Sequence, residues 1–414
     1  MQKKESLTAT RPNWADLWTG TGPSPQSSTD SPTNSDLPLS HREIRVRPPV
    51  NLLASPRFVA LDVQHNVPLA PRTSLELGGP ARYLVEAADE ATVIEALRWA
   101  DDRQLRVLVL GGGSNVLIGD EGWDGLAIHL GLRGLESHTS PQGVRLRVAA
   151  AEPWDDVVAT AAAEGWAGIE CLSGIPGSTG ATPIQNVGAY GQEVADVIAA
   201  VHVWDRRAGC RRVLLPDACG FGYRDSVFKR DPTAAVVLAV ELLLQPGGAP
   251  TLRYGELARA MQSSGATTVA QTREHVLGLR RRKSMVIDPE DPNRRSAGSF
   301  FTNAVVDTTV AEALVATAMQ QGLVDDAAAV PRYALDDGQV KIPAAWLIEA
   351  AGFRKGERRG AVGISSRHAL ALVHHGGGRT RDLVAFAQEI RDRVQQRFGI
   401  ELRPEPVFAG VTLR

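Results

Sequence analysis

The sequence is poor in cysteine, and it has neither a long apolar run nor an excess of charge of one sign. Its three cysteines show no CxxC spacing, which argues against a disulfide scaffold or a zinc ribbon and favours a reducing compartment. No apolar run approaches the roughly 18 residues that span a bilayer. The positive charges of the first residues are not followed by an apolar segment, so we expect no secretory signal and a cytoplasmic protein.

The charges are nearly balanced, with 45 basic and 47 acidic residues, so no overall attraction to nucleic acid or to an anionic membrane is expected. Metal chemistry is not indicated either. His374 and His375 are neighbours on a predicted strand and point to opposite faces, and no HExxH motif or Cys/His cluster occurs.

A 43% hydrophobic content is ample for a large core of two or three domains, but it is not evenly spread. Residues 1–58 are rich in Ser, Thr and Pro and predict a disordered tail, either dispensable or regulatory. Beyond the tail, helices and strands mix without strict alternation, which favours the α+β class. The apolar patterns predict helices over 90–103, 152–166, 272–284, 341–352 and 380–399, and strands over 106–110, 125–130, 144–150, 197–205, 234–244 and 368–375.

Two polar, glycine-rich loops follow predicted elements. The first, Gly111–Asn115, can form an anion-binding nest of backbone N–H groups, although a structural hairpin explains a triple glycine equally well. It is not a dinucleotide fingerprint, because Val116 stands where a third glycine belongs. The second loop spans 171–194, carries five glycines, and suits a diphosphate and the edge of a heterocycle, the alternative being an ordinary surface loop.

The segment SAGSFFTN (296–303) sets one hydroxyl, that of Ser299, against the apolar side chains of Phe300 and Phe301. A buried hydroxyl without a partner costs about 1–3 kcal/mol. Ser299 therefore has either a backbone partner within its own loop or a function.

Five motifs stand in order along the chain and together carry a resemblance. They are GGGSNVLIGDEGWDG, ECLSGIPGSTGATPIQNVGAYG, FGYRDSVFK (221–229), AGSFFTN (297–303) and LRPEPVFAG (402–410). The sequence resembles the UDP-N-acetylenolpyruvoylglucosamine reductase family, in its longer variant with a substrate tyrosine, over residues 67–410. Such enzymes act in peptidoglycan precursor synthesis.

The resemblance implies an FAD-binding region of the vanillyl-alcohol-oxidase type, with α+β subdomains at 59–135 and 136–248, and an α+β substrate-binding domain at 249–414. It implies a monomer that binds FAD non-covalently, because the first loop offers no histidine for attachment, and that uses NADPH as co-substrate. The cofactor-binding residues that it implies are Gly111, Gly112, Gly113, Ser114 and Asn115 of the first loop, and Gly174, Ile175, Gly177, Ser178, Gly180, Gln185, Asn186, Gly188 and Ala189 of the second.

The implied reaction reduces the enolpyruvyl group of UDP-N-acetylglucosamine enolpyruvate to give UDP-N-acetylmuramate. By resemblance, Ser299 donates a proton to the carbanion-like carbon, Arg224 contacts the substrate carboxylate, and Glu405 stabilises or protonates the intermediate. Without the resemblance, Arg224 would be interpreted as a salt-bridge partner of Asp225 or Asp231, and Glu405 as a turn residue. The two phenylalanines after Ser299 are expected to keep the site dry.

Four further residues are expected at the substrate. Tyr254 matches the tyrosine associated with UDP, Lys283 and Asn303 match residues near the diphosphate and sugar, and Tyr190 is expected to touch the substrate or the nicotinamide. The arginines 280–282 are interpreted as a solvated basic face and receive no role. At Ala350 many members of the family carry glutamine, so one expected polar contact to the substrate is missing.

Two other functions stay open. One is a sugar or alcohol oxidase of the same flavin superfamily, against which SAGSFFTN and RPEP argue. The other is a nucleotide-sugar-binding regulator without turnover, against which Ser299, Arg224 and Glu405 argue. Peroxide formation without NADPH consumption favours the first, and a colourless protein that binds UDP-sugars favours the second.

Overall fold

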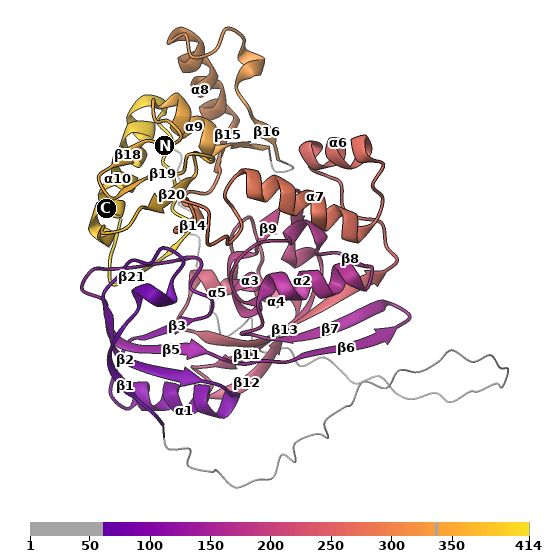
Figure 1. Cartoon of the computed structure of the whole chain (residues 1–414), viewed down its shortest axis with the longest axis vertical. Helices are drawn as coiled ribbons and strands as arrows, with labels where there is room; N and C mark the ends of the chain where they lie inside the picture. Colours follow the sequence, from indigo (N-terminus) through magenta and orange to yellow (C-terminus); the bar gives the residue numbers. More distant parts are fainter. Residues whose placement is uncertain (1–60, 336–337, 414) are drawn as a thin grey trace, which may run out of the picture. The chain divides into compact units, whose positions relative to one another are not determined.

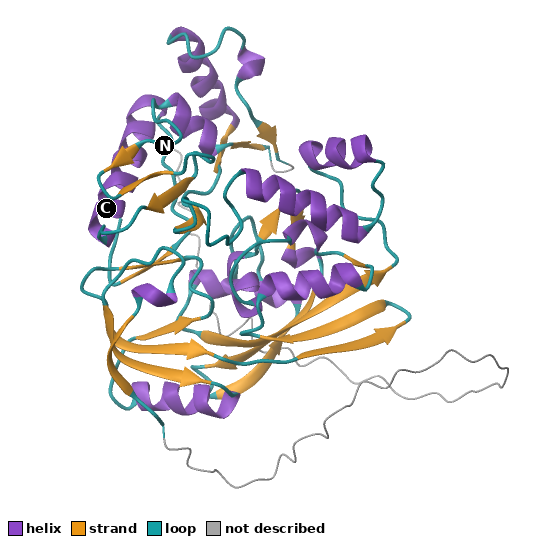
Figure 2. Ribbon diagram, viewed as in Figure 1, coloured by secondary structure: helices purple, strands orange, loops and turns teal. Residues whose placement is uncertain are grey.

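The computed structural model describes residues 61–335 and 338–413 (Figure 1). The tail predicted over residues 1–58 lies outside the described residues. Within the described part, the predicted mixture of helices and strands is observed, with several separate sheets and helices on them (Figure 2).

The first sheet has the strand order β1-β2-β5-β3, in which β2, β5 and β3 run parallel and β1 is antiparallel at the edge. Its elements are β1 (Gln64–Pro68), β2 (Pro80–Ala87), α1 (Glu90–Asp101), β3 (Val107–Leu110) and β5 (Trp123–Leu130). The side chain of Asp89 caps α1 by accepting from the Thr92 N–H at 2.7 Å. The predicted face of α1, which includes Val93 and Leu97, is buried as expected.

The second sheet is antiparallel, in the order β12-β11-β13-β7-β6, and the short strand β8 also pairs with β13. Its elements are β6 (Leu135–Ser140), β7 (Gly143–Ala149), α2 (Trp154–Ala163), β8 (Trp166–Ala167), β11 (Ile198–Asp205), β12 (Cys210–Leu214) and β13 (Ala235–Pro246). Trp204 and Val236 of this sheet belong to the same buried cluster as α1. The two sheets therefore share a core.

The second glycine loop is more ordered than an extended loop. It begins with two three-residue 3-10 turns, Glu170–Leu172 and Thr179–Ala181. The short elements α3 (Thr182–Gln185), β9 (Gly188–Ala189) and β10 (Gln192–Glu193) follow, and a third such turn, Val194–Asp196, ends it. The helices α4 (Pro216–Cys219) and α5 (Val227–Arg230) follow in the crossing between β12 and β13.

The C-terminal part contains a helix pair, two small sheets and three helices. Its elements are α6 (Gly255–Ser264), α7 (Val269–Arg282), β14 (Ser296–Ser299), β15 (Ala304–Asp307), α8 (Thr308–Gln320), a 3-10 turn at Ala327–Ala329, β16 (Tyr333–Ala334), β17 (Gln339–Ile342), α9 (Ala344–Ala350), β18 (Arg358–Arg359), β19 (Val362–Ile364), β20 (Ala371–His374) and α10 (Thr380–Phe398). The prediction of a helix from residue 341 was wrong at its start, because Lys341 and Ile342 pair with β15, and α9 begins only after Pro343. The predicted stripe of α10 is buried, and Gly399 ends the helix with φ +69°.

The end of the chain returns to the first glycine loop. The strand β21 (Val407–Ala409) pairs in parallel with β4 (Val116–Ile118), which directly follows that loop. The Val407 N–H donates to the Asn115 carbonyl at 2.9 Å, and the Glu405 N–H donates to the Phe300 carbonyl at 2.9 Å. Three segments that are far apart in the sequence therefore meet around Glu405.

Candidate active site

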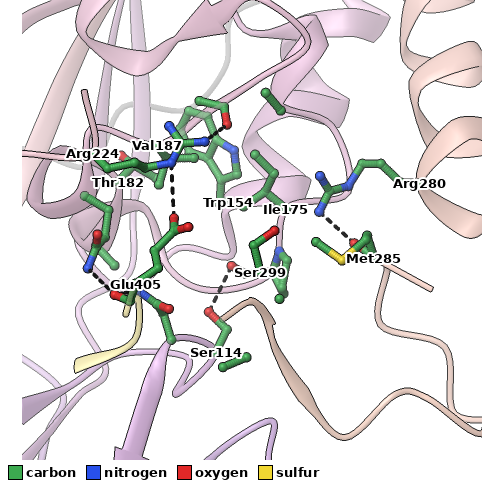
Figure 3. Close-up of a pocket in the computed structure, with 18 of the residues that line it drawn as sticks. Ser114, Trp154, Ile175, Thr182, Val187, Arg224, Arg280, Met285, Ser299 and Glu405 are labelled. Atoms are coloured by element: carbon green, nitrogen blue, oxygen red, sulfur yellow. Dashed lines mark hydrogen bonds and ion pairs between the residues drawn. The ribbon is translucent and has the colours of Figure 1, made fainter. Parts of the chain in front are cut away.

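A cavity of about 380 Å³ lies where the two glycine loops, the end of α7 and strand β14 come together (Figure 3). Many of the residues predicted from the sequence line it: Ser114, Asn115, Ile175, Ser178, Gln185, Gly188, Ala189, Tyr190, Arg224, Tyr254, Lys283, Ser299, Asn303 and Glu405. The fold thus brings the three predicted catalytic residues to one cavity.

The remaining part of the first loop lines an adjoining cavity of about 130 Å³, together with Gly177. The two loops pack closely here. A Cβ on Gly111 would stand 2.0 Å from the Ser178 hydroxyl oxygen, and one on Gly112 would stand 2.9 Å from the Cα of Gly177. The contact therefore requires glycine and brings backbone from both loops to the walls of both cavities.

Three residues predicted to bind the cofactor line neither cavity. The Gly174 N–H donates to Asp155, and the Gly180 N–H donates to the Ala150 carbonyl at 2.8 Å. Asn186 takes φ +40°, and its side chain bonds Glu193 at 2.6 Å and the Gly222 carbonyl at 2.9 Å. These residues hold the second loop in shape behind the cavity wall.

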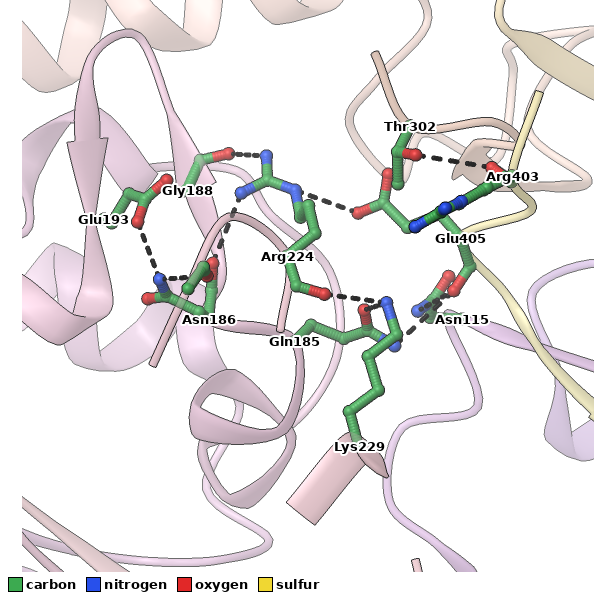
Figure 4. A network of polar contacts seen from close by, with 11 residues as sticks. Asn115, Gln185, Asn186, Gly188, Glu193, Arg224, Lys229, Thr302, Arg403 and Glu405 are labelled. Carbon is green, nitrogen blue, oxygen red and sulfur yellow. Dashed lines mark hydrogen bonds and ion pairs between the residues drawn. The ribbon is translucent and has the colours of Figure 1, made fainter. Parts of the chain in front are cut away.

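Arg224 and Glu405 form an ion pair in the wall, with 3.1 Å between Nε and Oε1 (Figure 4). The partners Asp225 and Asp231, considered from the sequence, instead pair with other arginines. Two more guanidinium nitrogens of Arg224 donate to the carbonyls of Asn186 and Gly188. A guanidinium has five N–H groups, so two of them stay without a partner among the described residues.

The surroundings of the Arg224–Glu405 pair shift the pKa of Glu405. Burial raises the pKa of the Glu405 carboxyl, and the neighbouring cations Arg224 and Lys229 act against that rise. Arg224 itself has φ +54°, a left-handed conformation that is strained for a residue with a side chain. Such strain is concentrated at functional sites.

Ser299 ends β14, and a backbone irregularity aims it at the cavity. The pairing of β14 with β20 shifts register between Ser296 and Ser299, and Gly298 within the shift has φ +71°. A bulge of this kind redirects the following side chain. Among the described residues no hydrogen-bond partner is found for the Ser299 hydroxyl, which lines the cavity. The structure therefore argues against the alternative that the Ser299 hydroxyl is hydrogen-bonded to the backbone of its own loop.

Phe300 and Phe301 do not line the cavity, so the expectation that they keep it dry was wrong. Both are 1% exposed and pack in the core of the C-terminal part, with their rings 5.1 Å apart. Trp154, Ile175 and Met285 supply apolar surface to the wall instead.

The helix pair α6 and α7 supplies the far end of the cavity. A short turn joins the two helices, and apolar residues such as Leu257 and Val276 pack between them. The Tyr190 and Tyr254 rings meet edge to face at 5.3 Å, and the Lys283 Nζ lies 6.0 Å from the centre of the Tyr190 ring. Burial raises the pKa of the Tyr190 hydroxyl to about 12, so this residue stays neutral.

Two residues of the wall were missed from the sequence. Arg280, dismissed as part of a solvated basic face, is only 7% exposed, and its buried Nε has no partner in the described structure. The i, i+3 spacing of Arg280 and Lys283 in the helix predicted over 272–284 would put both on one face, a signal that was available. His368 also lines the cavity, and burial, followed by the charges of Lys283, Lys355 and Arg280, lowers its pKa to about 4. No sequence pattern marked this histidine.

Ala350 does not lie at the cavity. Its side chain packs against the C-terminal core, and its carbonyl accepts from Arg397. The alanine at this position therefore takes no polar group away from the cavity wall.

No group of three or more potential metal ligands is found within the described residues. His374 is occupied structurally, since one ring nitrogen contacts the Leu75 carbonyl at 3.1 Å and the other accepts from the Gly378 N–H. None of the described helices is both long and apolar enough to cross a membrane.

Two family models match this chain. Residues 81–213 match an FAD binding domain, and residues 289–409 match the C-terminal domain of UDP-N-acetylenolpyruvoylglucosamine reductase. With the mixed fold seen above, these matches confirm an FAD-binding region and a C-terminal domain of the expected family.

Two relatives and one solved structure share the name of that C-terminal domain's family. The UDP-N-acetylenolpyruvoylglucosamine reductase of Streptomyces coelicolor is 47% identical over 84% of this chain and 91% of its own length. That of Salinispora arenicola is 48% identical over 83% of this chain and 95% of its own length. The crystal structure of the Thermus caldophilus reductase of this name matches with a TM-score of 0.55 and 25% identity, covering 84% of this chain and 98% of the other.

Proposed function

The chain belongs to the UDP-N-acetylenolpyruvoylglucosamine reductase family, and we propose that the cavity bounded by Ser299, Arg224 and Glu405 is its active site. The protein is a flavin oxidoreductase that converts UDP-N-acetylglucosamine enolpyruvate to UDP-N-acetylmuramate in peptidoglycan synthesis, with FAD as cofactor and NADPH as reductant. The observation that carries the assignment is the meeting of three distant segments at one cavity, whose wall holds a partly buried ion pair and a serine without a partner among the described residues.

The residues present fit a bound flavin dinucleotide. The touching glycine loops leave two adjoining cavities lined by backbone, where the close approach of the two loops leaves no room for a Cβ on Gly111 or Gly112. Gly111–Asn115, Ile175, Gly177, Ser178, Gln185, Gly188 and Ala189 are the residues proposed to hold it. When bound, FAD accepts a hydride from NADPH and supplies a hydride to the terminal methylene of the enolpyruvyl group.

The chain's own residues manage the charge and the proton of this reduction. Hydride addition leaves negative charge on the ether-bearing carbon, which delocalises into the adjacent carboxylate. The fixed guanidinium of Arg224, with two N–H groups unassigned, suits that carboxylate. Ser299, free of protein partners in the described structure, is proposed to donate the proton, and Glu405 beside Arg224 to stabilise or protonate the intermediate.

The far end of the cavity suits the nucleotide end of the substrate. Lys283 brings positive charge to the wall, and Tyr254, 40% exposed, offers a ring on which a uracil could stack. Tyr190 and Asn303 are proposed to contact the substrate. The Oδ1 of Asn303 accepts from the Ala344 N–H at 3.0 Å, which fixes this side chain at the cavity wall.

The boundaries 59–135, 136–248 and 249–414 remain our proposal for the two FAD-binding subdomains and the substrate-binding domain.

A cytoplasmic location is proposed because Cys171 and Cys219 are buried free thiols, which suits a reducing compartment. A monomer is proposed, as the resemblance to the family implies.

The direct test is an anaerobic assay with NADPH and UDP-N-acetylglucosamine enolpyruvate. With catalytic amounts of enzyme, we expect NADPH absorbance to fall continuously only when the enolpyruvyl substrate is present. One UDP-N-acetylmuramate should form for each NADPH consumed, as measured by mass spectrometry. Peroxide formation with a sugar, in air and without NADPH, would instead identify an oxidase. A colourless protein that binds UDP-sugars without turnover would identify a regulator.

The contact between the glycine loops gives a test of the cofactor assignment. Gly112→Ala puts a methyl group 2.9 Å from the Gly177 backbone, so the loops must separate, at about 1–3 kcal/mol. We expect weaker FAD binding, measured as a lower flavin-to-protein absorbance ratio and a raised dissociation constant for FAD. In the control Gly278→Ala, the new methyl group meets nothing closer than 3.8 Å, and FAD binding should be unchanged. Equal FAD affinity in both variants would contradict the assignment.

A further inference from the structure

We propose that Lys229 is a positioning residue for this reaction: from behind the cavity wall, its ammonium group fixes the Arg224 backbone and the Gln185 side chain, and so the Arg224–Glu405 pair. The inference rests on the proposed active site and extends it to a residue that contacts no ligand. In the described structure, Lys229 lines neither cavity.

Two short hydrogen bonds define the position of the ammonium group (Figure 4). The Lys229 Nζ lies 2.8 Å from the carbonyl oxygen of Arg224 and 2.9 Å from Oε1 of Gln185. Its helix, α5, is itself anchored, because Ser226 caps it and donates to the Ile184 carbonyl at 2.8 Å. The lysine therefore bonds Arg224 and Gln185 from a fixed support.

The bond to Arg224 falls on a strained residue. A positive φ in a residue with a side chain persists only where the surroundings impose it. The Arg224 carbonyl accepts from the ammonium group while its guanidinium bonds the carbonyls of Asn186 and Gly188. Arg224 is thus held at both ends, and loss of the ammonium group would free the backbone end.

The bond to Gln185 decides which way an amide faces. An ammonium group only donates, so it selects the oxygen end of the Gln185 amide and turns the nitrogen end away. That nitrogen lies 3.5 Å from the Glu405 carbonyl oxygen, which also accepts from Asn115 at 3.4 Å. Lys229 thereby reaches the backbone of Glu405 through one intermediate side chain.

The charged groups around the Arg224–Glu405 pair make the effect of Lys229 depend on pH. Glu405 faces Arg224, Lys229 and Tyr223, and Lys229 in turn faces Glu405, Asp225 and Arg224. Burial raises the pKa of Glu405, whereas the ammonium group of Lys229 lowers it. Removing that positive charge must move the pKa of Glu405 further upward.

The test compares Lys229→Met with Lys355→Met, in which the lysine removed is an exposed one paired with Glu349 at 3.5 Å. With the FAD-loaded enzyme under anaerobic stopped flow, we expect Lys229→Met to be reduced by NADPH within about twofold of wild type. Its reoxidation by the enolpyruvyl substrate should slow by about 10²-fold, the cost of misplacing a reacting group by an ångström. Lys355→Met should match wild type in both steps.

Two further measurements separate positioning from loss of structure. The limb of the reoxidation pH profile that belongs to Glu405 is identified as the one that Glu405→Gln abolishes. In Lys229→Met, this limb should move to higher pH. In Lys229→Arg, which keeps the positive charge, it should stay near its wild-type position. Calorimetric binding of UDP-N-acetylmuramate to the oxidised enzyme should weaken in Lys229→Met and be retained in Lys355→Met.

A Lys229→Met enzyme with wild-type reoxidation and an unmoved limb would overturn the inference while leaving the proposed function intact. Slowing without movement of the limb would also overturn it, since a purely structural defect would explain that result. Failure of the wild-type enzyme to be reoxidised by the substrate would instead reject the proposed function.

Discussion

Ser299→Ala is expected to slow product formation severely while leaving the reduction of bound FAD by NADPH intact. The hydroxyl is the group that we propose to protonate the carbon next to the carboxylate, and general acid catalysis is typically worth about 10²–10⁴-fold. We therefore expect reoxidation by the enolpyruvyl substrate to slow by that factor. Stopped-flow absorbance of the flavin, followed separately with NADPH and with substrate, measures the two steps.

A matched control exists on the same strand. Ser296 opens β14, is buried, and does not line the cavity, so Ser296→Ala removes a hydroxyl from β14 without touching the site. That variant should retain both steps. Normal reoxidation in Ser299→Ala, or an equal loss in both variants, would show that Ser299 is not the proton donor.

Arg224→Lys is expected to slow reoxidation about as strongly, although it keeps the positive charge. A lysine cannot reach Glu405, Asn186 and Gly188 together, because an ammonium group lacks the planar fork of a guanidinium. One well-aimed charge-stabilising donor is worth about 2.7–4 kcal/mol in the transition state. The loss should show in kcat as well as in the KM for the enolpyruvyl substrate, and the KM for NADPH should change little.

Arg230→Lys provides the comparison, since Arg230 lies a few residues further on, is exposed, and pairs with Asp225 at the surface. It should leave both constants unchanged. If Arg224→Lys raised only the KM for the substrate, Arg224 would bind the ground state and the transition state equally, and its proposed role in stabilising charge would be wrong.

Several local features of this protein could be predicted from residue patterns. The apolar stripe of α10 and the left-handed Gly399 that ends it follow from helical periodicity and from the freedom of glycine. The two glycine loops could be recognised as backbone-lined segments. The start of α9 was mispredicted, because pairing of Lys341 and Ile342 with β15 overrides the local helical pattern. The roles expected of Ser299, Arg224 and Glu405 came from the resemblance to a family.

Other features of the site depend on contacts that no local pattern encodes. The burial of Arg280 and His368 in the cavity wall follows from the packing of α7 and of the segment before β20. The same holds for Phe300 and Phe301, which face the core, whereas Ser299 faces the cavity because of a register shift in β14.

The sequence by itself determined the segments: where glycine allows two backbones to touch, where apolar periodicity makes helices, and which motifs carry the chemistry. Only the tertiary structure decided which distant residues meet. The parallel pairing of β21 with β4 brings Glu405 beside Arg224 at 3.1 Å, with Lys229 behind them. The physical reason is that strand pairing and burial join residues far apart in the chain, whereas propensity and periodicity act only between near neighbours.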